Sequence, residues 1–117
     1  MNDDSFQTLT GDIREFAKER DWEQFHDPKS LILALTGEVG ELAELFQWVK
    51  ADEALARFSE PWRKQRASEE ISDVLIYILR LADVLKIDIA AAATEKVQDS
   101  RRRFLPEDFF GLAPEKE

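Results

Sequence analysis

Apolar residues recur at helical spacing along four stretches of this chain. The stretches run from about Ser5 to Arg20, from Pro28 to about Lys50, from Pro61 to about Lys86, and from Asp88 to about Arg103. At about 100° per residue, this spacing gives each stretch one apolar face, as in an amphipathic helix. No strand-like alternation is sustained anywhere in the sequence, so the predicted fold class is all-α, a bundle of four main helices.

Capping and turn residues indicate where these helices begin and end. Asp27 followed by Pro28 is typical of an N-cap and a first helical turn, and Asp88 can cap the fourth helix. Pro106 is expected to end the fourth helix, and residues 107–117 are expected to form an irregular tail.

Two pairs of acidic residues interrupt the apolar faces of the second and third helices. The pairs are Glu38-x-x-Glu41 and Glu70-x-x-Asp73. A helical wheel places the first acid of each pair inside the apolar sector, within roughly 40° of apolar neighbours, and the second acid at the edge of that sector. Both helices therefore carry the same unusual pattern.

A carboxylate among apolar side chains needs a cation or a proton, because an unpaired buried charge costs several kcal/mol. Among the helical neighbours of these acids, only Arg66 could pair locally, with Glu70. Carboxylate oxygens are the ligands that Mg²⁺ prefers, and a metal held by carboxylates commonly handles phosphate. The sequence therefore suggests a divalent-metal site between two helices.

Composition narrows the classes of function. The chain has 117 residues, 44% apolar and 35% charged, which predicts a single globular domain with its core at about residues 5–106. A net charge of −9 argues against nucleic acid or an anionic membrane as the main partner. The absence of cysteine excludes disulfides and thiol catalysis and fits a cytoplasmic protein. Residues 1–12 are acidic and polar, so neither a signal peptide nor a membrane span is expected.

Three motifs carry a resemblance to a known family. They are ERDWEQFH at residues 19–26, LTGEVGELAELFQW at residues 35–48 and EEISDVLIY at residues 69–77. Together they resemble the MazG-like all-α nucleoside triphosphate pyrophosphohydrolases, and within that family the dCTP pyrophosphatases most. The resemblance spans roughly residues 10–106.

The resemblance implies hydrolysis of a (deoxy)nucleoside triphosphate, dCTP or a modified dCTP, to its monophosphate and pyrophosphate, as housekeeping of the nucleotide pool. It also implies that Mg²⁺ is held by Glu38, Glu41, Glu70 and Asp73. Glu41, at the sector edge where it can face both metal and solvent, is the expected base for the attacking water. The alternative within the same chemistry is a pyrophosphohydrolase of broader specificity.

Candidate substrate-binding residues form two groups. Aromatic rings stack on a nucleobase and their polar tips can read its edge, while basic side chains bind phosphate. The candidates are Trp22, His26, Trp48 and Tyr77 for the base, and, by similarity to the family, Lys96, Ser100 and Arg103 for the sugar and phosphates. Without the resemblance, such aromatic residues are more often core, and basic residues in a last helical turn complement the helix dipole.

The chain departs from the family pattern at three positions. Ser100 stands where relatives commonly have an asparagine that contacts the deoxyribose, and Phe104 stands where they have a tyrosine. Ile13 stands where the nearest relatives place a histidine that contacts the base. The resemblance therefore does not extend to the residues that contact the deoxyribose and the base in those relatives.

Apolar side chains extend beyond the core sector of the second and third helices. They are Phe46, Trp48, Ile76 and Leu79. A monomer of this size should not expose so much apolar surface, so we expect a homo-oligomer, either a helical dimer or, as the family resemblance suggests, a tetramer. A neighbouring chain can then complete each pocket.

Two other classes of protein fit the sequence less well. A non-catalytic helical-bundle interaction protein would need neither Mg²⁺ nor nucleotide, but acids on apolar faces count against it. A ferritin-like redox di-metal bundle needs Glu-x-x-His motifs, whereas the sole histidine, His26, lies outside both acid-bearing helices.

Overall fold

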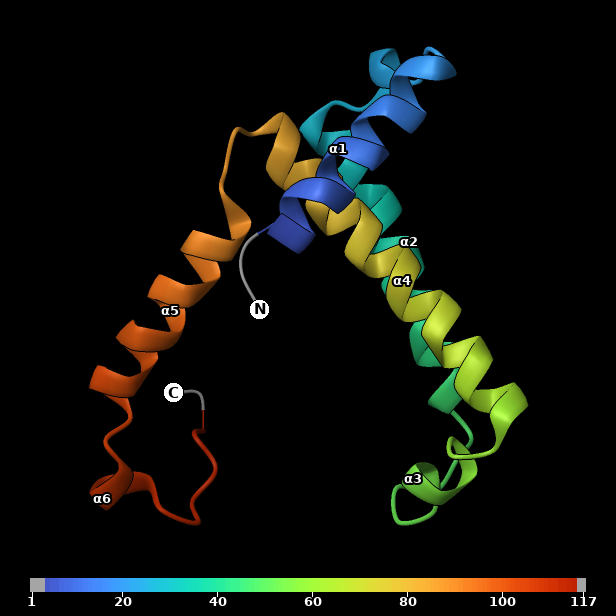
Figure 1. Cartoon of the computed structure of the whole chain (residues 1–117). Helices are drawn as coiled ribbons and strands as arrows, with labels where there is room; N and C mark the ends of the chain where they lie inside the picture. The colour runs from blue at the N-terminus through green and yellow to red at the C-terminus, as the bar shows by residue number, and fades with distance from the viewer. Residues whose placement is uncertain (1–3, 116–117) are drawn as a thin grey trace. The chain divides into compact units, whose positions relative to one another are not determined.

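The computed structural model describes residues 4–115, and helices dominate that range (Figure 1). No strand occurs among these residues, so the predicted all-α class is confirmed. The chain divides into two compact units, Met1–Ile87 and Asp88–Glu117, which are described separately. Within the same described range, no helix combines the length and the apolar character needed to cross a membrane.

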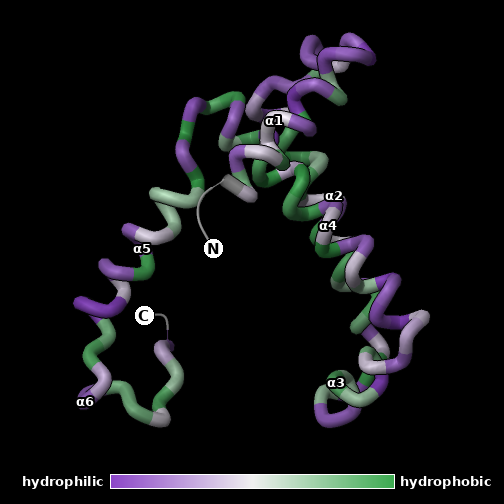
Figure 2. The backbone as a smooth tube through the Cα atoms, viewed as in Figure 1, coloured by the Kyte–Doolittle hydropathy of each residue, from purple (hydrophilic) through white to green (hydrophobic). Residues whose placement is uncertain are grey.

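The first unit is built around a helical hairpin. Its elements are α1 (Asp4–Glu19), the 3-10 helix η1 (Glu23–Phe25), α2 (Pro28–Phe46), the one-turn helix α3 (Ala54–Arg57) and α4 (Pro61–Val84). Helices α2 and α4 run antiparallel along each other, and α1 packs against α4 (Figure 1). Apolar positions recur along both long helices, separated by polar ones (Figure 2).

The predicted start of α2 is confirmed. The Asp27 carboxylate accepts a hydrogen bond from the backbone N–H of Ser30 at 2.9 Å, and Pro28 occupies the first turn. The helix ends at Phe46, earlier than the predicted Lys50. The connector then brings Phe58 back to stack on Phe46, with 4.0 Å between ring centroids, which fixes the turn into α4.

The core of the first unit lies between α2 and α4 and where α1 packs on α4. Its buried apolar residues are Ala17, Leu31, Ala67, Leu79 and Ala82. The expectation that Leu79 is exposed is wrong, because its side chain is only 1% exposed. A wheel with one apolar sector misses this residue, since α4 is packed on two sides, by α2 and by α1.

The second unit consists of α5 (Ile89–Arg103) and the one-turn helix α6 (Pro106–Phe109). Asp88 caps α5 as predicted, with its carboxylate accepting from the backbone N–H of Ala91 at 3.1 Å.

The prediction of an irregular segment from residue 107 onward needs a correction, because Glu107 and Asp108 lie in α6. Pro106 does not end α5, which stops at Arg103; it opens α6, whose first turn those two acids complement. No helix continues through residues 110–115, and residues 116–117 lie outside the described residues.

Candidate metal and substrate site

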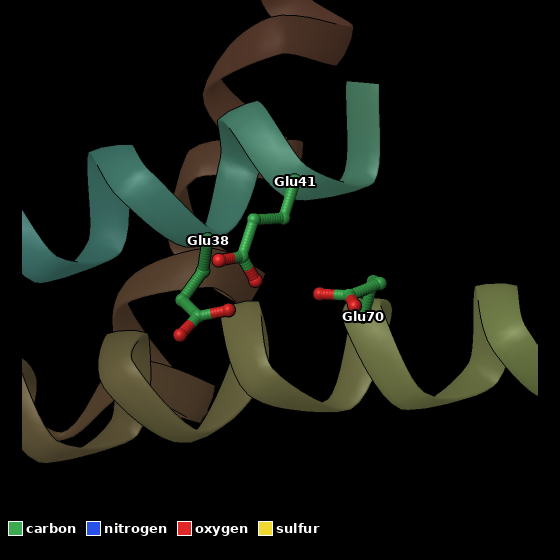
Figure 3. A group of neighbouring side chains, drawn as sticks. All are labelled: Glu38, Glu41 and Glu70. Carbon is green, nitrogen blue, oxygen red and sulfur yellow. The ribbon is translucent and has the colours of Figure 1, made fainter. Parts of the chain in front are cut away.

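Three of the four predicted metal-ligating acids converge on one point of the first unit. Glu38 and Glu41 extend from α2 and Glu70 from α4, and their carboxylates face one another across the hairpin (Figure 3). One carboxylate oxygen from each lies within 4.8 Å of the other two. That spacing suits a single cation shared by three carboxylates.

The burial of these acids follows the helical wheel. Glu70 is 7% exposed, Glu38 is half-buried and Glu41 is exposed. The antiparallel pairing of α2 and α4 places the two apolar faces against each other, so the first acid of each pair is carried inward. The second acid of the α2 pair stays accessible to solvent.

Two oxygens of the cluster are buried without a hydrogen-bond partner, Oε2 of Glu38 and Oε2 of Glu70. The predicted local pairing is confirmed, since Arg66 lies 3.5 Å from the other oxygen of Glu70. The side chain of Arg66 is 51% exposed and also pairs with Glu69 at 3.3 Å, so it offsets little of the cluster's charge. Such oxygens are suitable ligands for a hard cation, which would supply the missing partner.

Electrostatics in the cluster favour a proton or a cation. Burial raises the pKa of Glu38 above its ordinary value, and the negative charges of Glu41 and Asp73 raise it further. Burial also raises the pKa of Glu70, with a further rise from Glu41 that Arg66 partly opposes. Without a cation, the fold thus disfavours the charged form of both acids.

Asp73, the fourth predicted ligand, is half-buried on α4, one helical turn beyond Glu70. It is not among the three acids whose oxygens gather within 4.8 Å. Its charge nevertheless raises the pKa of both Glu38 and Glu70, so it lies within electrostatic range of the cluster.

The four residues predicted to contact the base differ in their surroundings. Trp22 lies at the start of η1 and meets Phe16 edge-on, with 5.7 Å between ring centroids. His26 is half-buried, and its Nδ1 accepts a hydrogen bond from Nε of Arg80 at 2.9 Å. Trp48 is 86% exposed just after α2, and Tyr77 is half-buried on α4.

The residues predicted to bind sugar and phosphate lie on α5, in the second unit. Lys96 is exposed and 4.0 Å from Asp99, and the guanidinium of Arg103 lies over the ring of Phe104 at 5.2 Å. Ser100 is half-buried, and its backbone carbonyl accepts the N–H of Phe104 at 2.8 Å.

A second polar cluster, formed by Arg14, His26, Arg80 and Asp83, was not predicted from the sequence. Arg80 is only 6% exposed and pairs with Asp83 at 3.0 Å. The signal was available: a charged pair three residues apart lies within the apolar run of the third helix, just as the acids do.

Comparison with known proteins gives one family and several close relatives. The model of the MazG nucleotide pyrophosphohydrolase domain matches residues 26–104. The human protein dCTP pyrophosphatase 1 is 51% identical over 90 residues, which are 77% of this chain and 53% of the human protein. The bovine protein of the same name is 50% identical over the same lengths. The chain spans about half the length of these curated relatives.

A solved structure shows that the fold of this chain is similar to that of a known pyrophosphatase. The crystal structure of a pyrophosphatase from Archaeoglobus fulgidus superposes with a TM-score of 0.79 and 38% sequence identity. The match covers 85% of this chain and 91% of the archaeal one.

Proposed function

The chain belongs to the MazG nucleotide pyrophosphohydrolase family, and we propose that it hydrolyses a (deoxy)nucleoside triphosphate to its monophosphate and pyrophosphate. The proposed substrate is dCTP or a modified dCTP, because the relatives named dCTP pyrophosphatase 1 are about half identical in sequence. The proposed role is removal of unwanted nucleotides from the pool.

One observation carries this proposal more than any other: Oε2 of Glu38 and Oε2 of Glu70 are buried and unpartnered beside a third acid, Glu41. A carboxylate oxygen in that situation is costly unless a cation meets it. The donor set consists of carboxylate oxygens alone, which favours Mg²⁺ over softer metals. The residues therefore fit the metal that the proposed reaction needs.

In the proposed site, Glu38, Glu41 and Glu70 hold Mg²⁺, and Asp73 serves as the fourth ligand. Bound there, Mg²⁺ would neutralise the triphosphate and make a nearby water more acidic. Glu41 is the exposed member of the gathered acids, so its carboxylate can also accept the proton of the attacking water. Glu38 and Glu70, held by the hairpin, fix the position at which the phosphates are held.

Recognition of the rest of the nucleotide is assigned by residue type. The exposed ring of Trp48 and the partly exposed ring of Trp22, which stand at opposite ends of α2, each offer a face on which a base can stack, and Tyr77 and His26 are proposed as polar contacts to the base. Lys96, Ser100 and Arg103 are proposed to contact the phosphates and sugar.

The protein is also proposed to act as a homo-oligomer. Helices α2 and α4 expose several large apolar side chains: Ile32 at 49%, Leu33 at 64%, Val39 at 47% and Ile71 at 54%. A stable helical interface buries such residues, and exposed ones favour association.

The test is a direct assay of turnover. Purified protein is incubated with each common NTP and dNTP plus Mg²⁺, and released pyrophosphate is measured. We expect release, highest with dCTP or a modified dCTP, and loss of release in Glu38→Gln. Glu44→Gln is the matched control, since Glu44 is an exposed acid on the same helix and outside the cluster.

No release from any nucleotide, or equal release by Glu38→Gln and the native protein, would falsify the proposed function. Similar rates for all triphosphates would support the chemistry and replace dCTP by a broader substrate range. A protein that neither turns over nucleotides nor responds to Mg²⁺ would favour the rival class, a non-catalytic helical bundle.

A further inference from the structure

The polar cluster on the other half of α4 joins three elements of the first unit. From α4, Nε of Arg80 donates to Nδ1 of His26 at 2.9 Å, and its Nη1 donates to Asp83 at 3.0 Å. From α1, Arg14 makes two hydrogen bonds to the Asp83 carboxylate, at 2.6 and 3.0 Å. One chain of contacts thus runs from α1 through α4 to His26. This residue directly precedes Asp27, the N-cap of α2.

The bond from Arg80 fixes the protonation of His26. A guanidinium is always protonated and can only donate, so Nδ1 must carry a lone pair. The imidazole is therefore neutral, with its proton on Nε2. Protonation of Nδ1 would set two donors against each other and break the contact.

The charges around His26 act in the same direction. Burial lowers the pKa of His26, and the positive charge of Arg80 lowers it further, while Glu23 of η1 opposes this change. Asp83 is already shared by Arg80 and by Arg14 from α1, which lower its pKa, so little of its charge is left to favour an imidazolium. The neutral form is thus maintained by α4 and opposed only from η1.

Two hydrogen bonds connect the segment between α1 and α2 to the helices. At the end of α1, Asp21 takes the left-handed conformation with φ 55°, and the N–H of Trp22 bonds back to the carbonyl of Ala17 at 2.9 Å. The segment 20–27 is thus tied to α1 at one end and reaches Arg80 through His26 at the other. Trp22 makes the first of these two ties through its own N–H, and His26 makes the second four residues later.

We propose that Arg80 is a positioning residue, which locks the neutral imidazole of His26 and so holds the segment that presents Trp22 to the nucleobase. The role of Trp22 at the nucleobase rests on the proposed function. The lock, by which we mean the hydrogen bond from Arg80 to the neutral imidazole of His26, does not. Arg80 would act only through His26, and no contact with substrate is assigned to its guanidinium.

The first experiment observes the lock without any nucleotide. The chain contains one histidine, so a long-range ¹H–¹⁵N correlation spectrum of the full chain reports His26 alone. We expect the Nε2–H tautomer, with a titration midpoint below the ordinary 6.5. In Arg80→Met the midpoint should rise and the tautomer preference should weaken. An Nδ1–H tautomer in the native protein, or an unchanged spectrum in the variant, overturns the lock.

The second experiment tests the consequence for the pocket by steady-state kinetics. Arg80→Met and His26→Ala should each raise the KM for the triphosphate about tenfold with little change in kcat, because a lost charge-assisted hydrogen bond is worth about one order of magnitude. The double variant should be no worse than either single one, since both break the same contact. Additive effects on KM, or losses confined to kcat, contradict a positioning role.

Two further variants guard against a merely structural defect. Arg80→Lys keeps a charge for Asp83 but loses the Nε donor, so it should raise KM as Arg80→Met does even if the methionine variant fails to fold. His26→Asn supplies an oxygen near the position of Nδ1 and should recover most of the native KM. Failure of this rescue overturns the proposal. If the native protein has no turnover, the proposed function fails, and the imidazole spectrum still decides the lock.

Discussion

Helix α4 carries two polar clusters that handle buried charge in opposite ways. Around Glu70, carboxylates from α2 and α4 gather, two buried oxygens have no partner, and one exposed arginine lies nearby. Around Asp83, two guanidinium groups share one carboxylate, and the inner guanidinium also donates to a neutral imidazole. The first cluster gathers like charges, and the second alternates them.

The titration of the two clusters reflects this difference. Burial and neighbouring acids raise the pKa values of Glu38 and Glu70. Hydrogen bonds from Arg14 lower the pKa of Asp83, despite its partial burial. A cluster that is satisfied by its own chain can be explained by stability alone, whereas the like-charged cluster requires something from outside the chain.

The largest expected effect follows from neutralising the like-charged cluster. Glu70→Gln should lower pyrophosphate release about a thousandfold, because a metal that polarises phosphate is worth several kcal/mol in the transition state. The same change should raise the melting temperature of the metal-free protein, since it removes a repelling buried charge. Glu69→Gln is the matched control, because Glu69 is the neighbouring acid, is exposed and pairs with the same Arg66. Equal effects of the two substitutions would contradict a special role for the gathered acids.

The next effect concerns the alternating cluster and changes stability. Asp83→Ala should lower the free energy of unfolding by about 3 kcal/mol, because it leaves the buried side chain of Arg80 without its carboxylate partner. Asp99→Ala should change it by less than about 0.5 kcal/mol, since Asp99 meets only exposed Lys96 and Arg102, at 4.0 and 3.9 Å. Chemical denaturation measures both. A loss of similar size at the two positions would show that the buried cluster contributes nothing special.

The pH dependence of stability should separate the clusters by sign. Glu38 and Glu70 have raised pKa values, so their contribution to metal-free stability is present below the ordinary 4.5 and is lost as pH rises through the folded values. Asp83 has a lowered pKa, so its contribution is present above the ordinary 3.8 and is lost as pH falls through the folded value.

Thermal unfolding in EDTA against pH measures this difference. The double variant Glu38→Gln/Glu70→Gln should gain stability relative to the native protein as pH rises above 4.5, and Mg²⁺ should cancel that gain. A gap between the two proteins that is constant with pH would contradict the raised pKa values.

The smallest expected effect concerns Arg66, the basic side chain that pairs with Glu70. Arg66→Met should strengthen Mg²⁺ binding by about two- to threefold, because an exposed ion pair contributes little and its removal leaves more negative charge for the metal. Calorimetry of Mg²⁺ binding to the variant and to the native protein measures the change. A marked weakening instead would place Arg66 among the groups that order the acids.

Much of the fold could be predicted from the sequence because local rules set it. Asp27 and Asp88 cap helices where their spacing predicts, and the inward positions of Glu38 and Glu70 follow from helical periodicity. The burial of Leu79 could not be predicted in this way, because it depends on how α1 packs on α4. The short helix α6 was missed because Pro106 can end one helix or begin another.

The candidate site shows the same limit. The convergence of Glu38, Glu41 and Glu70 could be anticipated, since two matching patterns on adjacent antiparallel helices bring their acids together. The partner of His26 could not, because Arg80 is 54 residues away in sequence. Long-range polar pairs carry no periodic signal, so only the assembled fold shows them.

We propose above all that the gathered acids of α2 and α4 form a divalent-metal site. Calorimetric titration of Mg²⁺ into the metal-free full chain tests it most directly, with Glu38→Gln and the control Glu44→Gln beside the native protein. We expect saturable binding to the native chain and to Glu44→Gln. Binding to Glu38→Gln should be about tenfold weaker or more, because this variant has lost one carboxylate ligand. The same isotherm for all three proteins, or no saturable binding to the native chain, would contradict it.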